Sequence, residues 1–415
     1  MFPSVLLSRP ALAVLTLLVV AAAAEWLPQL AFLRVLSPRA QGMAELTQAL
    51  EPEPASGEVE IDEETSERPE LAQPEQSQSR AVPGPIASGN GSESEPRIDV
   101  DEPPVSLVDA SALGAFYRAL ARSEAKVPGA ITRVLYHGDS VVASDYVTGT
   151  LRRKLQEQFG DSGHGFVLLA NAWPAYFHND VFRSASKGWN VSRIVGPYAS
   201  DGLYGLGGVS FRGHPGMRAS FGTARSGRFG RSVSSFEIGY LAQPGGGELR
   251  VLVDGQEHTR ILTAAPRAAS AFRRVELPDG EHVLELVVQR GSVRAFGVVL
   301  ERGEPGVVLD AIGVQGARIR FLDKQDDVHW AEQLAHRAPD LLVFHFGANE
   351  SADGVAYSMA DYHRTMKEVL LQARSALPGA SCLILAAMDR ARKEDAGVVT
   401  VPVIPRIVLE QQKTA

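Results

Sequence analysis

The segment ITRVLYHGDSVVASDY, residues 131–146, places a serine where a nucleophile could stand. An apolar run ends at Gly138, Asp139 and Ser140, and a segment with helical spacing follows. A serine between the end of a strand and the start of a helix faces the crevice outside the sheet, where open α/β folds bind their ligands. Glycine, aspartate and serine are also common in turns and helix caps, so this tripeptide alone favours a structural role.

A nucleophilic serine also needs donors for the oxyanion, a base, and a group that orients the base. Two further loops can supply donors. Gly316, in GVQGAR, follows a second apolar strand, and its backbone N–H can approach a carbonyl oxygen closely. Asn349, in HFGANES, follows another strand and can donate through its side-chain amide. The C-terminal ends of parallel strands meet at one edge of a sheet, so we expect Ser140, Gly316 and Asn349 to lie together there.

The elements that must position these residues alternate between strands and helices. The segments ITRVLYH, GVVLDAIG, LLVFH and CLILAAM are typical of buried strands, and amphipathic segments such as MADYHRTMKEVLLQARSAL are typical of helices. This alternation predicts the α/β class, with a parallel sheet that carries helices on both faces.

Residues 180–302 have a different sequence pattern. Short runs that alternate apolar and polar residues are separated by turn signals such as DG, PGGG and RGS. They predict an antiparallel β-sandwich inserted into the α/β domain. The stretch GLYGLGG, residues 202–208, lacks the preceding strand and following helix of a dinucleotide loop, so we do not interpret it as one.

On the Ser140, Gly316 and Asn349 blocks the chain resembles the SGNH (GDSL-type) hydrolase family, with Glu350 where that family usually has aspartate. The resemblance implies a flavodoxin-like, three-layer parallel sheet and Ser140 as nucleophile. It also implies an oxyanion hole of Ser140, Gly316 and Asn349, supported by Gly138, Asp139 and Gly347.

With its long insert, the chain is similar to the branch of bacterial cell-wall and polysaccharide O-acetylesterases that carry a carbohydrate-binding-like β module. The resemblance therefore implies an ester hydrolase that removes O-acetyl or other short acyl groups from an envelope polysaccharide or peptidoglycan. It implies no organic cofactor and no metal.

The base is the part that this sequence does not supply. The family places it in a C-terminal Asp-x-x-His block, and no such block follows the Asn349 loop before Ala415. We interpret Asp279–His282 and Asp326–His329, which precede that loop, as chance matches. We expect His137 and His345 to be packed residues, or residues that support the site from behind, rather than bases. We expect a C-terminally incomplete hydrolase domain, inactive alone. A catalytically idle glycan-binding protein and an O-acyltransferase on the same fold stay open as alternatives.

Charge and composition limit the classes of molecule that this protein can be expected to bind. The chain has 415 residues and a net charge of −8, and residues 51–102 hold 15 acidic residues against three arginines. That segment carries −12, so the rest of the chain is at about +4, without a basic stripe, which argues against nucleic acid. The single cysteine, Cys382, excludes an internal disulfide.

The N-terminal region predicts export to the periplasm or cell envelope. An apolar stretch that ends in alanines makes residues 1–24 a signal peptide or an N-terminal anchor, and residues 11–33 a possible membrane attachment. Residues 25–105 form a predicted disordered acidic, Pro-rich tether. The predicted hydrolase domain spans 106–179 and 303–415, on either side of the insert at 180–302.

Overall fold

A computed structural model describes residues 107, 109–174, 176–394 and 397–415. The predicted signal peptide or anchor and the whole of the predicted tether lie outside these residues. Within the described part of the chain, no helix is both long enough and apolar enough to cross a membrane.

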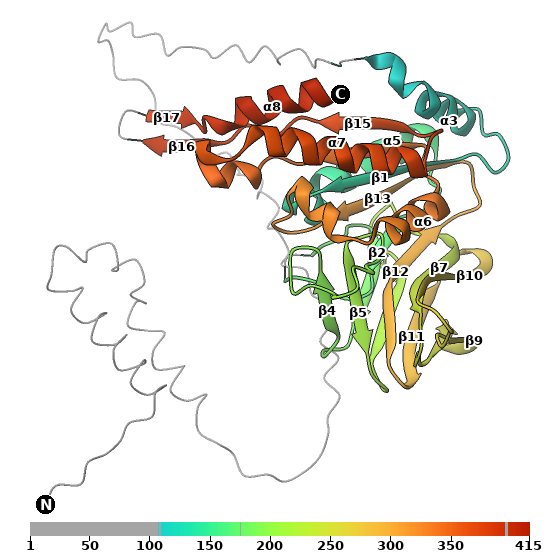
Figure 1. The fold of residues 1–415 in the computed structure, drawn as a ribbon. Coiled ribbons are helices and arrows are strands. Elements are labelled where there is room, and N and C mark those ends of the chain that lie inside the picture. The colour runs from blue at the N-terminus through green and yellow to red at the C-terminus, as the bar shows by residue number, and fades with distance from the viewer. Residues whose placement is uncertain (1–106, 108, 175, 395–396) are drawn as a thin grey trace, which may run out of the picture. The chain divides into compact units, whose positions relative to one another are not determined.

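A four-stranded parallel sheet forms the upper half of the ordered region in Figure 1. Its strand order is β13-β1-β14-β15. The strands are β1 (Ile131–Gly138), β13 (Gly306–Gly313), β14 (Leu341–His345) and β15 (Ser381–Leu385). All three pairings are parallel, and Gly138 at the end of β1 aligns with Gly313 on one side and His345 on the other. Three strands that lie far apart in the sequence therefore end at the same edge.

Helices cover both faces of this sheet (Figure 1). One face packs against Phe116 and Leu120 of α3 and against Leu151 of α5. The other face packs against Trp330 of α6 and Met366 of α7. The helical segments are η2 (Ala110–Leu113), α3 (Gly114–Glu124), α4 (Ser140–Ala143), α5 (Tyr146–Phe159), η3 (Ile319–Lys324), α6 (Asp327–Arg337), η4 (Glu350–Ala356), α7 (Met359–Ala376) and α8 (Val403–Thr414). The predicted α/β class with a parallel sheet is confirmed.

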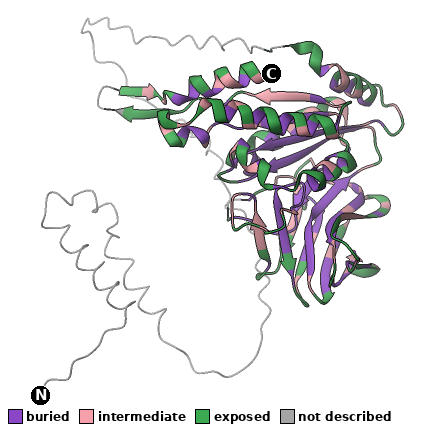
Figure 2. Cartoon of the chain, in the orientation of Figure 1, coloured by how far each residue is buried: buried purple, intermediate pink, exposed green. Residues whose placement is uncertain are grey.

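Two antiparallel sheets lie between β1 and β13 in the sequence and share one apolar core. The six-stranded sheet has the order β10-β7-β12-β5-β4, with β2 paired to β12, and the five-stranded sheet has the order β3-β6-β11-β8-β9. Their strands are β2 (Gly165–Leu168), β3 (Val181–Ala185), β4 (Asn190–Arg193), β5 (Val209–Gly213), β6 (Arg218–Thr223), β7 (Val233–Ala242), β8 (Glu248–Val253), β9 (Gln256–Leu262), β10 (Ala269–Gly280), β11 (Val283–Arg290) and β12 (Val293–Glu301). Figure 2 shows that most strands of both sheet systems are buried. The boundaries 106–179, 180–302 and 303–415 stay predictions, and β2 joins the antiparallel sheet although it lies before residue 180.

A buried ionic network joins the insert to the parallel sheet. Glu301, at the end of β12, accepts hydrogen bonds from Arg133 of β1 (2.8 Å) and Arg337 of α6 (2.5 Å). Arg337 also pairs with Asp310 of β13 at 2.6 Å. Burial favours the neutral carboxyl group, but the two arginines hold the pKa of Glu301 well below its usual range. The insert is therefore fixed to the strands that carry the site.

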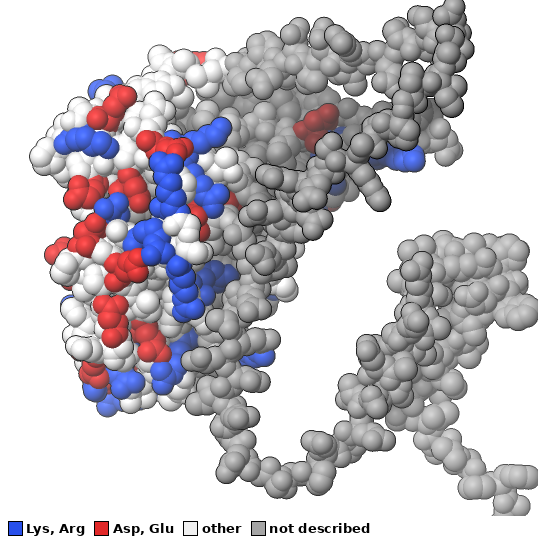
Figure 3. Space-filling view, turned by 180° about the vertical axis from the view of Figure 1, so that it is seen from behind, with Lys and Arg blue, Asp and Glu red and all other residues white. Residues whose placement is uncertain are grey.

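The surface has no large field of one sign on the face drawn in Figure 3, where charges of both signs are interspersed. This agrees with the near-neutral charge of the chain beyond residue 102. A short hairpin, β16 (Ala391–Glu394) and β17 (Gly397–Thr400), follows β15 and was not predicted from the sequence.

Candidate active site

The site lies where β1, β13 and β14 end. Each strand runs directly into a polar loop that carries one of the residues singled out in the sequence: Ser140, Gly316 and Asn349. Because Gly138, Gly313 and His345 align across the sheet, the three loops leave it at one edge. The structure thus brings these three residues to the same edge.

Ser140 is exposed and begins the short helix α4. Neither its hydroxyl nor its backbone N–H forms a hydrogen bond with another described residue. The turn before it is tight, since a Cβ on Gly138 would lie 2.4 Å from Val142 Cγ2 and 3.0 Å from the His345 carbonyl oxygen. The hydroxyl is therefore exposed, and the turn before it has no room for a side chain at Gly138.

Asp139 is buried and shapes the turn. Its Oδ1 accepts a hydrogen bond of 3.0 Å from the Val141 N–H, and its Oδ2 accepts one of 3.1 Å from Asn349 Nδ2. Burial raises the pKa of this carboxyl group, while the N–H of Val141 and the charges of His345 and Arg390 act against that shift.

The Asn349 amide connects all three loops. Its Nδ2 donates both to Asp139 Oδ2 and, at 2.9 Å, to the carbonyl oxygen of Ala317, the residue after Gly316. Both partners are acceptors, so the nitrogen must be the atom between them. To bind an oxyanion, the amide has to exchange one of these acceptors for the incoming oxygen.

Gly316 offers an unobstructed backbone donor. Its φ of 78° lies in the left-handed region, and nothing lies within 4 Å of the position that a Cβ would take. Its N–H forms no hydrogen bond with the described residues. Two backbone N–H groups, those of Ser140 and Gly316, are thus available near the Asn349 amide.

Glu350 fixes the two donor loops to each other, which sequence reasoning missed. The side chain is fully buried, and its Oε1 accepts from the Ile319 N–H at 2.8 Å while Oε2 accepts from the Gly347 N–H at 3.0 Å. Burial raises its pKa. The available signal was its place directly after Asn349, where the SGNH family usually has the shorter aspartate.

Gly347 cannot carry a side chain. Its φ is 125°, and an added Cβ would lie 2.5 Å from Ala387 Cβ and 3.0 Å from Ile407 Cγ2. A glycine here lets the segment after β15 and helix α8 approach the loop that holds Asn349.

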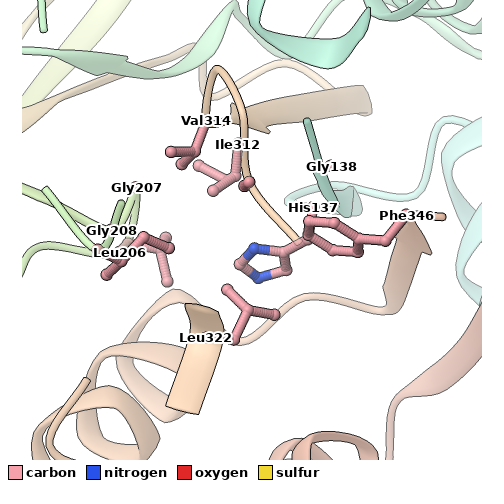
Figure 4. Close-up of a pocket in the computed structure, with 11 residues that line it drawn as sticks. His137, Gly138, Leu206, Gly207, Gly208, Ile312, Val314, Leu322 and Phe346 are labelled. Carbon is pink, nitrogen blue, oxygen red and sulfur yellow. The ribbon is translucent and has the colours of Figure 1, made fainter. Parts of the chain in front are cut away.

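His137 lies behind the site and faces away from solvent. Its ring points into a cavity of about 10 Å³ lined by Leu206, Ile312 and Leu322, as Figure 4 shows. Such a volume holds at most one water molecule. The ring stacks on Phe344, Nε2 has no hydrogen-bond partner, and burial lowers the pKa to about 3. His137 is a buried, packed residue, which is one of the two roles predicted for it.

None of the other candidate histidines contacts the serine hydroxyl. His345 Nδ1 lies 3.1 Å from the Tyr136 hydroxyl, and burial lowers the pKa of His345. Asp326 caps α6 by accepting from the His329 N–H. His282 lies 2.8 Å from Asp254, in the insert. Among the described residues, no imidazole forms a hydrogen bond with Ser140.

A metal site is likewise not seen in this part of the chain: no group of three or more His, Cys, Asp or Glu side chains in the described ranges could hold an ion. Cys382, on β15, is half-buried, and burial raises the pKa of its thiol to about 11.

The sequence matches no protein-family model and no curated protein. One similar solved structure is that of a peptidoglycan O-acetylesterase; its TM-score is 0.59 at 20% identity, and the match covers 72% of this chain and 80% of that chain.

Two family-two carbohydrate esterases also match. The Cellvibrio japonicus enzyme has a TM-score of 0.20 at 15% identity, covering 56% of this chain and 84% of its own. The enzyme from Corynascus (Myceliophthora fergusii), with its carbohydrate-binding domain, has a TM-score of 0.22 at 12% identity, covering 55% and 87%. Scores this low support no argument. The first match shows that this chain shares its fold with a peptidoglycan O-acetylesterase.

Proposed function

We propose that this protein is a serine esterase of the cell envelope that removes O-acetyl or similar short acyl groups from a polysaccharide or peptidoglycan. The observation that carries the proposal is the Asn349 amide. It joins the Ser140 and Gly316 loops, whose two backbone N–H groups form no hydrogen bond with any residue that the structure describes. The fold shared with a peptidoglycan O-acetylesterase supports the same substrate class.

The chemistry follows from the positions. Ser140 Oγ attacks the acyl carbonyl carbon, its proton passes to a base, and the carbonyl oxygen becomes an oxyanion. The N–H groups of Ser140 and Gly316 and the Asn349 amide donate to that oxygen. The bond from carbon to the sugar oxygen then breaks, and the sugar leaves as an alcohol with the proton. Water attacks the acyl-serine, releases the carboxylic acid and restores the hydroxyl.

The insert and the N-terminal region complete the proposal. The antiparallel sheets at 180–302 would hold the glycan, and residues 1–24 would direct the protein out of the cytoplasm, with 25–105 as a spacer. Exposed Phe177 supports a sugar ligand. Its backbone N–H donates to the Ala143 carbonyl oxygen of α4, and 48% of the residue is exposed, so an aromatic side chain lies at the surface close to the helix that Ser140 begins.

A second candidate is a glycan-binding protein that does not turn its ligand over. It is favoured by one observation: no histidine in the described ranges forms a hydrogen bond with Ser140. The oxyanion donors would then hold the acyl carbonyl without a following reaction.

Release of acetate from O-acetylated polysaccharide by the full-length protein tests the proposal. The proposal expects release by the parent, loss of release in Ser140→Ala, and retention in Ser144→Ala, whose hydroxyl bonds to the Val141 carbonyl oxygen in the same turn. Equal release by parent and Ser140→Ala would reject it. Binding without release would establish the second candidate, and an acetylated acceptor sugar without free acetate would establish acyl transfer.

A further inference from the structure

Arg390 stands at the same edge of the sheet as the proposed site. It follows β15, which runs parallel to β14, so the chain leaves the sheet beside the Asn349 loop. Its Nη1 donates to the Ala348 carbonyl oxygen at 2.7 Å and to Ser351 Oγ at 2.7 Å. These contacts join the guanidinium group to the residue before Asn349 and to the residue after Glu350.

Within the described ranges, no carboxylate lies close enough to the Arg390 guanidinium group to form an ion pair. Among the described residues Arg390 forms no ion pair, and both contacts use the same nitrogen, so Nε and the Nη2 amino group keep their donors free. Arg318, which contacts the same loop, is by contrast paired with Asp353.

A role in holding the Asn349 loop in place does not by itself explain why Arg390 lies here without an ion-pair partner among the described residues. Arg406 fastens the same segment from α8, through a bond of 3.1 Å to the Val355 carbonyl oxygen, and also forms no ion pair in the described part of the chain. Arg390 differs in its place on the segment, because it bonds to Ala348 and Ser351 on either side of Asn349, whereas Arg406 bonds to Val355 farther along the chain. Arg406 is therefore the matched comparison for Arg390 on this segment.

Two buried carboxyl groups, Asp139 and Glu350, lie beside the proposed oxyanion hole. They disfavour an anionic ligand unless a cation offsets them. A guanidinium with its fork of donors free fits the planar, singly charged carboxylate in two parallel hydrogen bonds.

We propose that Arg390 binds a carboxylate of the glycan, so that the acylated substrate is an acidic polysaccharide of uronic-acid type rather than a neutral one. The inference rests on the proposed function for the site, but it concerns binding and not turnover. Arg390 is a specificity-determining residue that engages the sugar acid next to the ester-bearing position.

Calorimetric titration of the full-length Ser140→Ala protein tests the inference without hydrolysis of the ligand. The two ligands are O-acetylated tri-galacturonic acid and its carboxyl methyl ester. We expect the acid to bind about tenfold more tightly than the methyl ester, which is the effect of one charge-assisted hydrogen-bonded pair. Arg390→Gln in the same background should bring the ratio of the two dissociation constants to about one, while Arg406→Gln should keep it.

Equal affinity for both ligands, no binding of either, or a preference that survives Arg390→Gln would overturn the inference. Near-ultraviolet circular dichroism of each variant checks that the fold is kept, and Arg390→Lys should retain part of the preference because it keeps the charge. Acetate release by the parent is measured separately. Its absence with an intact acid preference would reject the esterase but not the acidic ligand, and its presence without the preference would do the reverse.

Discussion

Asn349 Nδ2 donates a hydrogen bond of 3.1 Å to Asp139 Oδ2, although the two residues are 210 positions apart in the sequence. The contact places the carboxamide next to the turn that presents Ser140. Its second donor reaches the Ala317 carbonyl oxygen at 2.9 Å, beside Gly316. One side chain therefore sets the spacing of all three loops on which the proposed chemistry depends.

Replacing Asn349 by alanine should lower kcat for acetyl ester hydrolysis about 10²- to 10³-fold, the usual loss for one oxyanion donor. KM should change little, because the oxyanion exists only after attack. Steady-state kinetics on p-nitrophenyl acetate measures both constants. Asn190→Ala, at an exposed position of β4, is the control and should leave kcat as it is. A similar kcat for Asn349→Ala and parent would remove Asn349 from the oxyanion hole.

Glu350→Gln should destabilise the protein by roughly 1–3 kcal/mol, because an amide has one acceptor atom for two backbone N–H groups. The amide's own N–H₂ would then face either Ile319 or Gly347. Urea denaturation gives the free energy of unfolding. Glu368→Gln, at an exposed pair with Arg364 on α7, should change it by less than about 1 kcal/mol. Equal effects at the two sites would show that Glu350 does not fasten the loops.

Arg337→Met should lower the free energy of unfolding by about 3–5 kcal/mol, since it leaves two buried carboxylates, Glu301 and Asp310, without this partner. Arg364→Met on the exposed face of α7 is the matched change and should have little effect. Thermal unfolding followed by circular dichroism compares them. A loss below about 1 kcal/mol at Arg337 would mean that the network does not hold the insert to the sheet.

Acid should weaken the fold through His137. Burial lowers the folded-state pKa to about 3, whereas an unfolded histidine has its ordinary value of 6.5. Between these values the unfolded chain binds the extra proton, so the free energy of unfolding falls as the pH falls, by up to about 1.4 kcal/mol per pH unit.

His137→Phe keeps a ring against Phe344 and loses no side-chain hydrogen bond with a described residue. In this variant the free energy of unfolding should therefore depend less steeply on pH between about pH 4.5 and 6. The slope should fall by nearly the contribution of one bound proton, about 1.4 kcal/mol per pH unit. His164 and His178, whose pKa values burial also lowers, account for slope that remains. An unchanged slope in urea titrations across this range would contradict a neutral, buried His137.

The strands of the parallel sheet and the edge at which they end could be predicted because each is an apolar run followed by a polar or glycine-containing loop. The positions of Ser140, Gly316 and Asn349 follow from that rule alone. The Glu350 and Arg390 contacts could not be predicted, because each joins loops whose distance in space depends on how the whole sheet is assembled. The pairing of β2 with β12 could not be predicted either, because a short apolar run does not indicate which sheet the strand joins.

The most direct test is covalent labelling of the full-length protein with a fluorophosphonate ester, followed by peptide mass spectrometry. The account predicts one phosphonyl group on the peptide containing Ser140, loss of esterase activity in proportion to labelling, and no label in Ser140→Ala. Full labelling at another serine, or ester hydrolysis that continues while Ser140 is blocked, would contradict it.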